Sequence, residues 1–269
     1  MIKLGLIGGG FQHAYSSTLW KKPSNFTWAK NETRDITCFV DEAIIEELIN
    51  NKNRIKKKIG WIVESSAIIP QTVEYIKKYH KEISQSFDFI ITHDNSIVCL
   101  AENFYYLPPS GYWIENPQCY AKDRLCSMIT SNKSQCDGHV HRLQLAKKLQ
   151  NKLDLFGRGI KDFNIKEDAL SDYMFSVTME NASYSGYWSE KILDCFACGT
   201  IPIYYGDPDI GDHFNKDGII ILDDSFDPSM LSSELYLSKQ DAIIDNFERC
   251  LKYNVIEDIM WQKYIKEII

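Results

Sequence analysis

Short apolar runs alternate with longer amphipathic segments along the first part of the chain. The runs that predict buried strands lie at residues 2–7, 35–40, 59–63 and 87–92. Helices are expected at 41–51, where Asp41 can cap the first turn, at 70–83, and after the glycine turn that ends the first run. Strands that alternate with helices are typical of parallel βαβ units, so this block predicts an α/β fold.

The same alternation resumes after the proline-containing segment 108–117. Further strands are predicted at 125–130, 153–156, 174–178, 200–204 and 218–222, further helices at 138–149 and 188–198, and an amphipathic helical remainder from 227 onward. We therefore expect two α/β domains, 1–115 and 116–269, with the C-terminal helices in the second. Open parallel sheets bind ligands at the carboxyl ends of their strands, so candidate chemistry is sought in the loops that follow strands.

Composition and charge narrow the class of protein. The chain has 269 residues, of which 44% are hydrophobic, which is enough apolar surface for a core and excludes global disorder. A net charge of −7 gives no general attraction to nucleic acid or to an anionic membrane. No apolar stretch approaches the ~18 residues of a membrane span, and the N-terminal run is too short for a signal peptide. We therefore expect a soluble, cytoplasmic protein with no transmembrane segment and no nucleic-acid partner, whose 8 cysteines are reduced thiols.

The glycine turn after the first predicted strand suggests one function. Gly8-Gly9-Gly10 supplies the first part of a dinucleotide-binding fingerprint, but His13 stands where that fingerprint has Gly or Ala. Asp41 imitates the ribose-binding acid of NAD enzymes, although it follows the glycines at a longer spacing than usual. The alternative interpretation is a tight strand-to-helix turn, which needs glycines whatever is bound.

Two cysteine and histidine patterns allow a metal or redox hypothesis. Cys195 and Cys198 form a CxxC, but they fall at the end of a predicted helix, where the helix dipole opposes thiolate formation. Cys136, His139 and His141 could join them as zinc ligands, although nothing in the spacing fixes that partnership. Burial as small hydrophobic side chains is the interpretation that we favour for Cys195 and Cys198.

The segment 173–214 carries the most specific signal. A buried strand runs into Glu180-Asn181, a polar loop follows, and a helix opens with Ser189 as its expected N-cap and Glu190-Lys191 in its first turn. Free amides and the dipole at a helix N-terminus attract an anion, and Lys191 adds a full positive charge. Glu190 can accept two hydroxyl hydrogens, as a ribose would donate them. A solvated, purely structural first turn is the alternative.

This segment resembles a known family. Glu180-Asn181-Ala-Ser, Tyr187-Trp-Ser189-Glu190-Lys191 and Ile201-Pro202-Ile-Tyr-Tyr-Gly206 follow, in order and spacing, the donor-binding motif of the family-10 glycosyltransferases, the α-1,3/4-fucosyltransferases. The departures are Ala182-Ser183 for the family's Ser-x and Ser189 for its Thr, which keeps the hydroxyl.

Weaker likeness extends upstream. Ser131-Asn132 with Arg142, and the Gly157-Arg158-Gly159 loop, are similar to segments of the family's C-terminal domain. In the first block, Trp61-Ile-Val-Glu64-Ser65 resembles the family's Trp-x-x-x-Glu-Ser-Pro, with one residue fewer between Trp and Glu and with Ser66 in place of Pro.

The resemblance implies two Rossmann-like domains facing a cleft, the GT-B arrangement, with the acceptor against the first domain and a GDP-sugar in the second. It implies inverting, metal-independent transfer of fucose from GDP-fucose to a hydroxyl of a glycan acceptor, with no cofactor and no metal site. Glu64 is then the expected general base, with Asp94 and His93 as reserve candidates. The expected donor-binding residues are Arg158, Asn181, Tyr187, Glu190 and Lys191. Asp207-Pro-Asp209 resembles a metal-binding D-x-D, but we interpret it as a turn.

Two other functions remain open at this stage. One is an NAD-linked oxidoreductase built on the glycine turn. The other is a non-catalytic relative that binds a sugar nucleotide, because 269 residues is short for a two-domain transferase.

Overall fold

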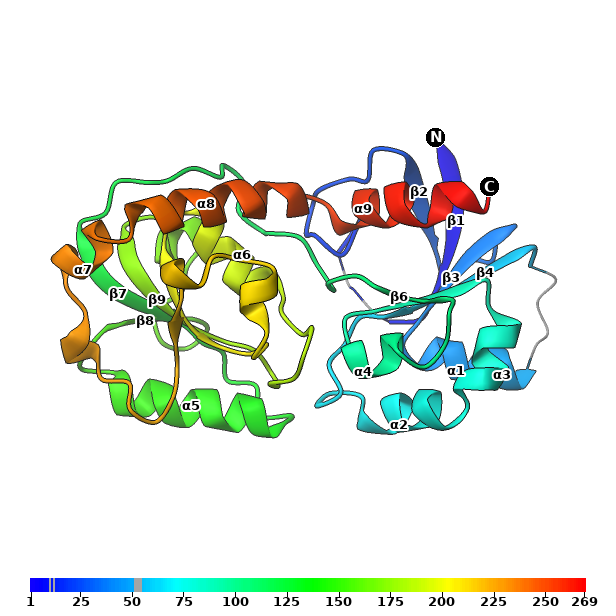
Figure 1. Ribbon diagram of the computed structural model, residues 1–269, viewed down its shortest axis with the longest axis horizontal. Helices are drawn as coiled ribbons and strands as arrows, with labels where there is room; N and C mark the ends of the chain where they lie inside the picture. The colour runs from blue at the N-terminus through cyan, green and yellow to red at the C-terminus, as the bar shows by residue number, and fades with distance from the viewer. Residues whose placement is uncertain (10, 12, 51–54) are drawn as a thin grey trace. The chain divides into compact units, whose positions relative to one another are not determined.

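Two parallel β-sheets organise the chain, which the computed structural model describes at residues 1–9, 11, 13–50 and 55–269. Each sheet belongs to its own compact unit (Figure 1). Unit 1 contains residues 1–111, 185–187 and 255–269, and unit 2 contains residues 112–184 and 188–254. Residues 255–269 therefore fold with the first unit, whereas the sequence analysis grouped all C-terminal helices with the second domain.

The sheet of unit 1 has the strand order β2-β1-β3-β4-β5-β6, and every neighbouring pair is parallel. Its strands are β1 (Ile2–Ile7), β2 (Phe26–Lys30), β3 (Ile36–Val40), β4 (Lys57–Ile62), β5 (Phe89–Thr92) and β6 (Phe104–Tyr106). The central strands read as nearly continuous apolar runs because both faces of the sheet are covered.

Helices cover both faces of this sheet. One face carries α1 (Glu42–Asn50), α2 (Pro70–Lys78), α3 (His80–Ser86) and α4 (Asn95–Val98), as Figure 1 shows. Phe39, Ile62 and Ile90 of the strands pack there against Ile44 and Ile76. The opposite face carries α9 (Ile256–Lys263), which is followed by the 3-10 turn η6 (Ile265–Glu267).

Unit 2 is built on a five-stranded parallel sheet with the order β11-β10-β9-β7-β8. Its strands are β7 (Arg124–Ile129), β8 (Asp154–Phe156), β9 (Tyr173–Met179), β10 (Ile201–Tyr205) and β11 (Ile220–Ile221). Its helices are α5 (Asp137–Leu149), α6 (Glu190–Ala197), α7 (Ser233–Leu237) and α8 (Gln240–Cys250). Short 3-10 turns complete it: η1 (Lys166–Ala169), η2 (Ile210–Asp212), η3 (Lys216–Gly218), η4 (Pro228–Met230) and η5 (Leu251–Tyr253).

The helices of unit 2 also lie on both sides of their sheet, with α5 on one side and α6 and α8 on the other (Figure 1). Ala146 and Leu149 of α5 pack against Met128 and Val177 of the strands. Ile192 and Phe196 of α6 belong to a separate buried cluster. This packing holds α6 against the face of the sheet, next to the strand that ends at Met179. The position of the first turn of α6 is thereby fixed.

The helix expected after the glycine turn is wrong, since the described residues between β1 and β2 form bends and turns. Local hydrogen bonds give the physical reason. Ser16 Oγ donates to Lys21 O at 2.7 Å and accepts from Thr18 N at 3.0 Å. Such side-chain bonds to the nearby backbone compete with helical hydrogen bonding. The helix expected over 70–83 is also divided, into α2 and α3, which meet at Tyr79.

No helix in the described ranges combines the length and apolar character needed to cross a membrane.

Candidate functional site

The loops at the carboxyl end of the unit 2 sheet are packed closely against one another. A Cβ atom added to Gly138, in the first turn of α5, would lie 2.1 Å from Asn181 O, so the two backbones touch. A Cβ added to Gly157, whose φ of 135° also favours glycine, would lie 1.8 Å from Thr130 O. The segments that follow β7, β8 and β9 are therefore held together at the edge where parallel sheets bind ligands.

Glu180 anchors the first turn of α6. Its carboxylate is fully buried and accepts hydrogen bonds from Ser189 N at 2.9 Å and from Ser189 Oγ at 2.8 Å. Lys191 Nζ donates to Glu180 Oε2 and to Ser189 Oγ, each at 2.9 Å. Ser189 also caps the helix by accepting from Lys191 N at 3.4 Å, as the sequence predicts. The motif thus fixes a lysine at a helix N-terminus through a buried acid.

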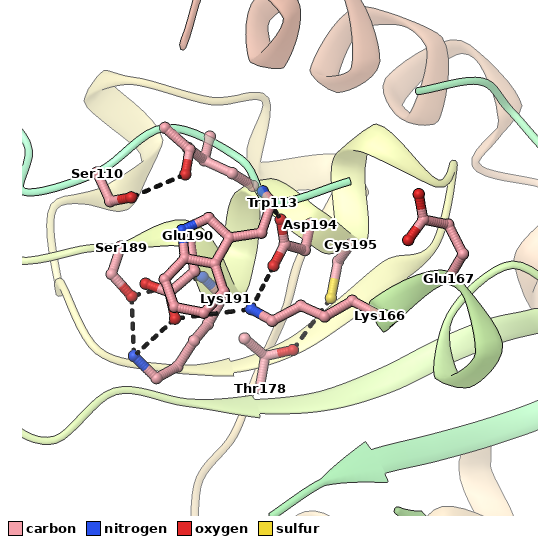
Figure 2. A network of polar contacts seen from close by, with 12 residues as sticks. Ser110, Trp113, Lys166, Glu167, Thr178, Ser189, Glu190, Lys191, Asp194 and Cys195 are labelled. Carbon is pink, nitrogen blue, oxygen red and sulfur yellow. Dashed lines mark hydrogen bonds and ion pairs between the residues drawn. The ribbon is translucent and has the colours of Figure 1, made fainter. Parts of the chain in front are cut away.

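Glu190 lies between two lysines, as Figure 2 shows. Its Oε1 is 3.6 Å from Lys166 Nζ and 3.7 Å from Lys191 Nζ. Lys166 Nζ also pairs with Asp194, whose other oxygen accepts from Trp113 N at 2.5 Å. We call Glu180, Glu190, Asp194, Lys166 and Lys191, together with Ser189, the α6 network.

The α6 network keeps Glu190 ionised. Burial opposes ionisation of this carboxyl, but Lys191, Lys166 and hydrogen bonds from Ser189 and its own backbone outweigh it and lower its pKa to about 2. The ion pairs also affect the pKa of Lys166. Burial lowers this pKa, but the negative charges of Asp194 and Glu190 outweigh burial and raise it above its usual value. Neither lysine is within hydrogen-bond distance of Glu190, so its oxygens keep capacity for a ligand's hydroxyl groups.

Two further predicted donor residues lie at the same edge of unit 2. Arg158 is exposed on the turn after β8, between Gly157 and Gly159. Asn181 directly follows Glu180, and its side chain interacts with His139 of α5. Burial lowers the pKa of His139, Arg142 and Lys133 lower it further, and the hydrogen bond with Asn181 opposes them. Unit 2 therefore brings Asn181, Glu190 and Lys191 to one loop cluster, with Arg158 on the neighbouring turn.

Glu64 and Tyr187 belong to unit 1. Glu64 follows β4, and two buried side chains hold the backbone around it. Asp41 Oδ1 accepts from Val63 N at 2.8 Å and from Glu64 N at 3.3 Å. His93 Nε2 lies 3.3 Å from Glu64 O, a contact that requires the proton on Nε2. We call residues 63–65 the Glu64 loop.

The reserve bases have structural partners in unit 1. Burial lowers the pKa of His93 to about 4, so its ring is neutral at pH 7, and it packs against the Tyr187 ring at 4.8 Å. Asp94 caps α4 by accepting from Ser96 N at 2.9 Å, and it lies 3.7 Å from Lys77 Nζ. His93 and Asp94 thus both have structural roles in unit 1.

The glycine turn departs from a dinucleotide site in two respects. Among residues 11 and 13–25, which the structure describes beyond the turn, no helix offers its N-terminus to a diphosphate. The Asp41 carboxylate holds the Glu64 loop through its two backbone hydrogen bonds, and burial raises its pKa to about 7. Gly10 itself lies outside the described residues.

The cysteine and metal hypotheses find little support in the same contacts. Cys195 and Cys198 are buried at the end of α6, as predicted, and burial raises the pKa of Cys195 to about 12. Across the described ranges, no three His, Cys, Asp or Glu side chains gather closely enough to hold a metal ion. Asp207 Oδ1 accepts from Asp209 N at 2.8 Å, which is the turn predicted for this segment.

The fold is that of the GT-B glycosyltransferases, with two parallel α/β units. A solved α1,3-fucosyltransferase matches 92% of this chain and 80% of its own, with 17% identity and a TM-score of 0.52. A second structure, an α1,3-fucosyltransferase with GDP, matches 99% of this chain and 90% of its own, with 14% identity and a TM-score of 0.51.

The chain belongs to glycosyltransferase family 10, the fucosyltransferase family. The model of the family's C-terminal region matches residues 120–267. An α-(1,3)-fucosyltransferase of Helicobacter pylori is 32% identical over 92 residues, which are 33% of this chain and 19% of that protein. The match thus spans about a fifth of the length of that relative.

Three residues of the α6 region were missed by the sequence analysis: Trp113, Lys166 and Asp194. Lys166 and Asp194 are 28 residues apart in the sequence, and no local spacing connects them. One signal was present for Asp194, because it follows Glu190 by one helical turn and an i,i+4 pair of carboxylates on one helix needs a cation.

Proposed function

We propose that this protein is an inverting, metal-independent glycosyltransferase that moves fucose from GDP-fucose to a hydroxyl group of a glycan acceptor. The α6 network is the observation that carries the proposal. It combines the ionised carboxylate of Glu190, whose side chain is 15% exposed, with a lysine and a helix N-terminus within one turn of helix. The fucosyltransferase structure solved with GDP adds support for a guanosine diphosphate donor.

The donor would be held by complementary groups of unit 2. Glu190 would accept hydrogen bonds from the two ribose hydroxyls, since its carboxylate stays ionised. Lys191 and the dipole of α6 would neutralise the diphosphate, with Arg158 as a second cation from the turn after β8. Asn181 would help to position ribose and phosphate, as would Tyr187, which the structure groups with unit 1.

The transfer step requires a base and a leaving group that can carry charge. Glu64 would take the proton of the acceptor hydroxyl as its oxygen attacks the anomeric carbon of fucose. The bond from that carbon to the diphosphate breaks on the opposite side. The configuration at the anomeric carbon is therefore inverted, and GDP leaves. Lys191 and Arg158 would stabilise the charge that develops on the leaving phosphate, in place of a metal ion.

A turnover experiment tests the proposal. The full chain is incubated with GDP-fucose, GDP-mannose or UDP-glucose and a panel of glycans, in EDTA and again with Mg²⁺ or Mn²⁺. We expect release of GDP and transfer of fucose in EDTA, with the anomeric configuration of the product opposite to that of the donor by NMR. Retained configuration or an absolute metal requirement would contradict the corresponding part of the proposal.

Two results would replace the proposal with another function. A rise in melting temperature with NAD and none with GDP would favour an oxidoreductase. GDP binding with neither transfer nor slow hydrolysis of GDP-fucose would favour a non-catalytic, sugar-nucleotide-binding relative.

A further inference from the structure

Lys166 is almost fully enclosed by groups that fix its position. Its side chain is 17% exposed, and Nζ lies 4.3 Å from the centre of the Trp113 ring. The same nitrogen pairs with Asp194 and lies 3.6 Å from Glu190 Oε1 (Figure 2). The lysine comes from η1, before β9, so tertiary structure brings it to the first turn of α6.

The spacing of the two acids explains why a cation is needed there. Glu190 and Asp194 are one helical turn apart on α6, where two carboxylates on the same face repel each other. Asp194 is 1% exposed, so water does little to screen that repulsion. Lys166 lies between the two acids and offsets the repulsion for both. Without Lys166, the attraction of Lys191 would act on Glu190 unopposed and would turn its carboxylate toward Lys191, whether or not Asp194 is charged.

We propose that Lys166 is a positioning residue that sets the selectivity of Glu190 for the vicinal ribose hydroxyls of a nucleoside diphosphate. Lys166 pairs with one side of Glu190 at ion-pair rather than hydrogen-bond distance. It therefore fixes the charge and direction of the carboxylate without using its hydrogen-bonding capacity. Lys166 itself does not touch the ligand, because Asp194 and Trp113 hold its Nζ.

This inference rests on the proposed function, in which Glu190 meets a ribose. The role of Lys166 can nevertheless be tested separately, because a purely structural Lys166 would affect the binding of all ligands equally. A positioning role predicts a loss confined to ligands that carry both ribose hydroxyls.

The test measures the affinities of the full chain for GDP and for 2′,3′-dideoxy-GDP by calorimetry. The variants are E190Q, D194N and the double variant K166M/D194N. The double variant removes the Lys166–Asp194 ion pair as a whole, so no buried carboxylate is left unpaired. D194N is its matched control, because Lys166 still faces Glu190 and the side-chain amide oxygen of the introduced asparagine can still accept from the Trp113 backbone amide.

We expect the wild-type chain and D194N to prefer GDP by about a hundredfold or more, the size of two hydrogen bonds to a charged group. E190Q and K166M/D194N should each bring that preference below about threefold, with little change in affinity for the dideoxy ligand. A K166M/D194N variant that keeps the wild-type preference would overturn the inference alone. A wild-type chain that binds no GDP would overturn the proposed donor and the inference with it.

Discussion

Ionisable side chains at the carboxyl edges of the two sheets are used in opposite ways. In unit 2, Glu190 lies between two lysines, which lower its pKa to about 2. In unit 1, Asp41 and His93 face backbone groups of the Glu64 loop, and burial brings their pKa values to about 7 and about 4. The edge of unit 2 therefore keeps Glu190 charged, while the edge of unit 1 holds a loop with two groups that burial drives toward the neutral form.

The charges at the two edges suit different roles. Fixed charges at the edge of unit 2 suit an anionic ligand with hydroxyl groups, because they need no rearrangement when it binds. The two groups in unit 1 suit a scaffold, since their hydrogen bonds to the backbone position the Glu64 loop while burial reduces their charge. The loop carries Glu64, the residue that we propose as the base.

The largest expected effect tests the role of the Glu64 loop. Glu64→Gln should lower the rate constant of fucose transfer by about 10²- to 10⁴-fold, because the acceptor hydroxyl loses its base. Affinity for GDP should stay unchanged, since the proposal assigns Glu64 to the acceptor hydroxyl and not to the donor. Steady-state kinetics and calorimetry measure the two quantities. Glu102→Gln, an exposed glutamate of unit 1, is the matched control. Full activity of the Glu64 variant would remove Glu64 from the mechanism.

The next effect tests the fixed charges of unit 2. Lys191→Met leaves the fully buried Glu180 without its ion pair, so the free energy of unfolding should fall by about 2–4 kcal/mol. Urea denaturation at pH 7 measures it. Lys148→Met, an exposed lysine on α5, should change it by less than about 0.5 kcal/mol. Equal stability of the two variants would mean that the Lys191–Glu180 pair contributes nothing.

The pH dependence of stability should differ in sign between the two edges. The folded-state pKa of Asp41 is raised to about 7, so its contribution is present below about pH 4 and is lost as the pH rises to 7. The Asp41→Asn variant should therefore gain about 2 kcal/mol relative to the wild type between pH 5 and pH 8. Asn tolerates the left-handed φ of 51° at this position. Denaturation at several pH values gives the difference.

Glu190→Gln should show the opposite dependence of stability on pH. The folded-state pKa of Glu190 is lowered to about 2, so its contribution is present above about pH 4.5 and is lost as the pH falls to 2. The wild type should lose its advantage over this variant in acid, whereas it loses ground to Asp41→Asn toward pH 8. If stability relative to the wild type changed with pH in the same direction in both variants, the two edges would not differ as described.

The smallest effect concerns the exposed cation of unit 2. Arg158→Ala should leave the melting temperature unchanged, because the side chain is exposed. Affinity for GDP should fall by about three- to tenfold, as one charge-assisted contact with a phosphate is lost. Calorimetry at low and at physiological salt separates this contact from general attraction. An unchanged affinity at both salt concentrations would exclude Arg158 from the donor site.

Local pattern was enough to predict much of the fold. Most strands were predicted because they are continuous apolar runs, and the start of α6 because Ser189 is a good cap. β2 (Phe26–Lys30) was missed, since it lies at the edge of its sheet and most of its residues are only half buried. The segment before it was also mispredicted, because the hydrophobic pattern does not show that Ser16 bonds to the nearby backbone in place of a helix.

The residues of the candidate site also differ in whether a local pattern reveals them. Glu190 and Lys191 could be found from sequence because they are neighbours within a motif. Lys166 and Asp41 could not, because they act on residues 20 or more positions away, and only the folded chain brings the groups together.

Amide hydrogen exchange of the wild-type chain with and without GDP tests the central claim most directly, because it locates the ligand without any substitution. We predict slower exchange in the first turn of α6, at residues 189–193, and in the Gly157–Gly159 turn, with no protection of the glycine turn at residues 5–9. Protection confined to the glycine turn, or unchanged exchange at residues 189–193 when GDP is bound, would contradict the account.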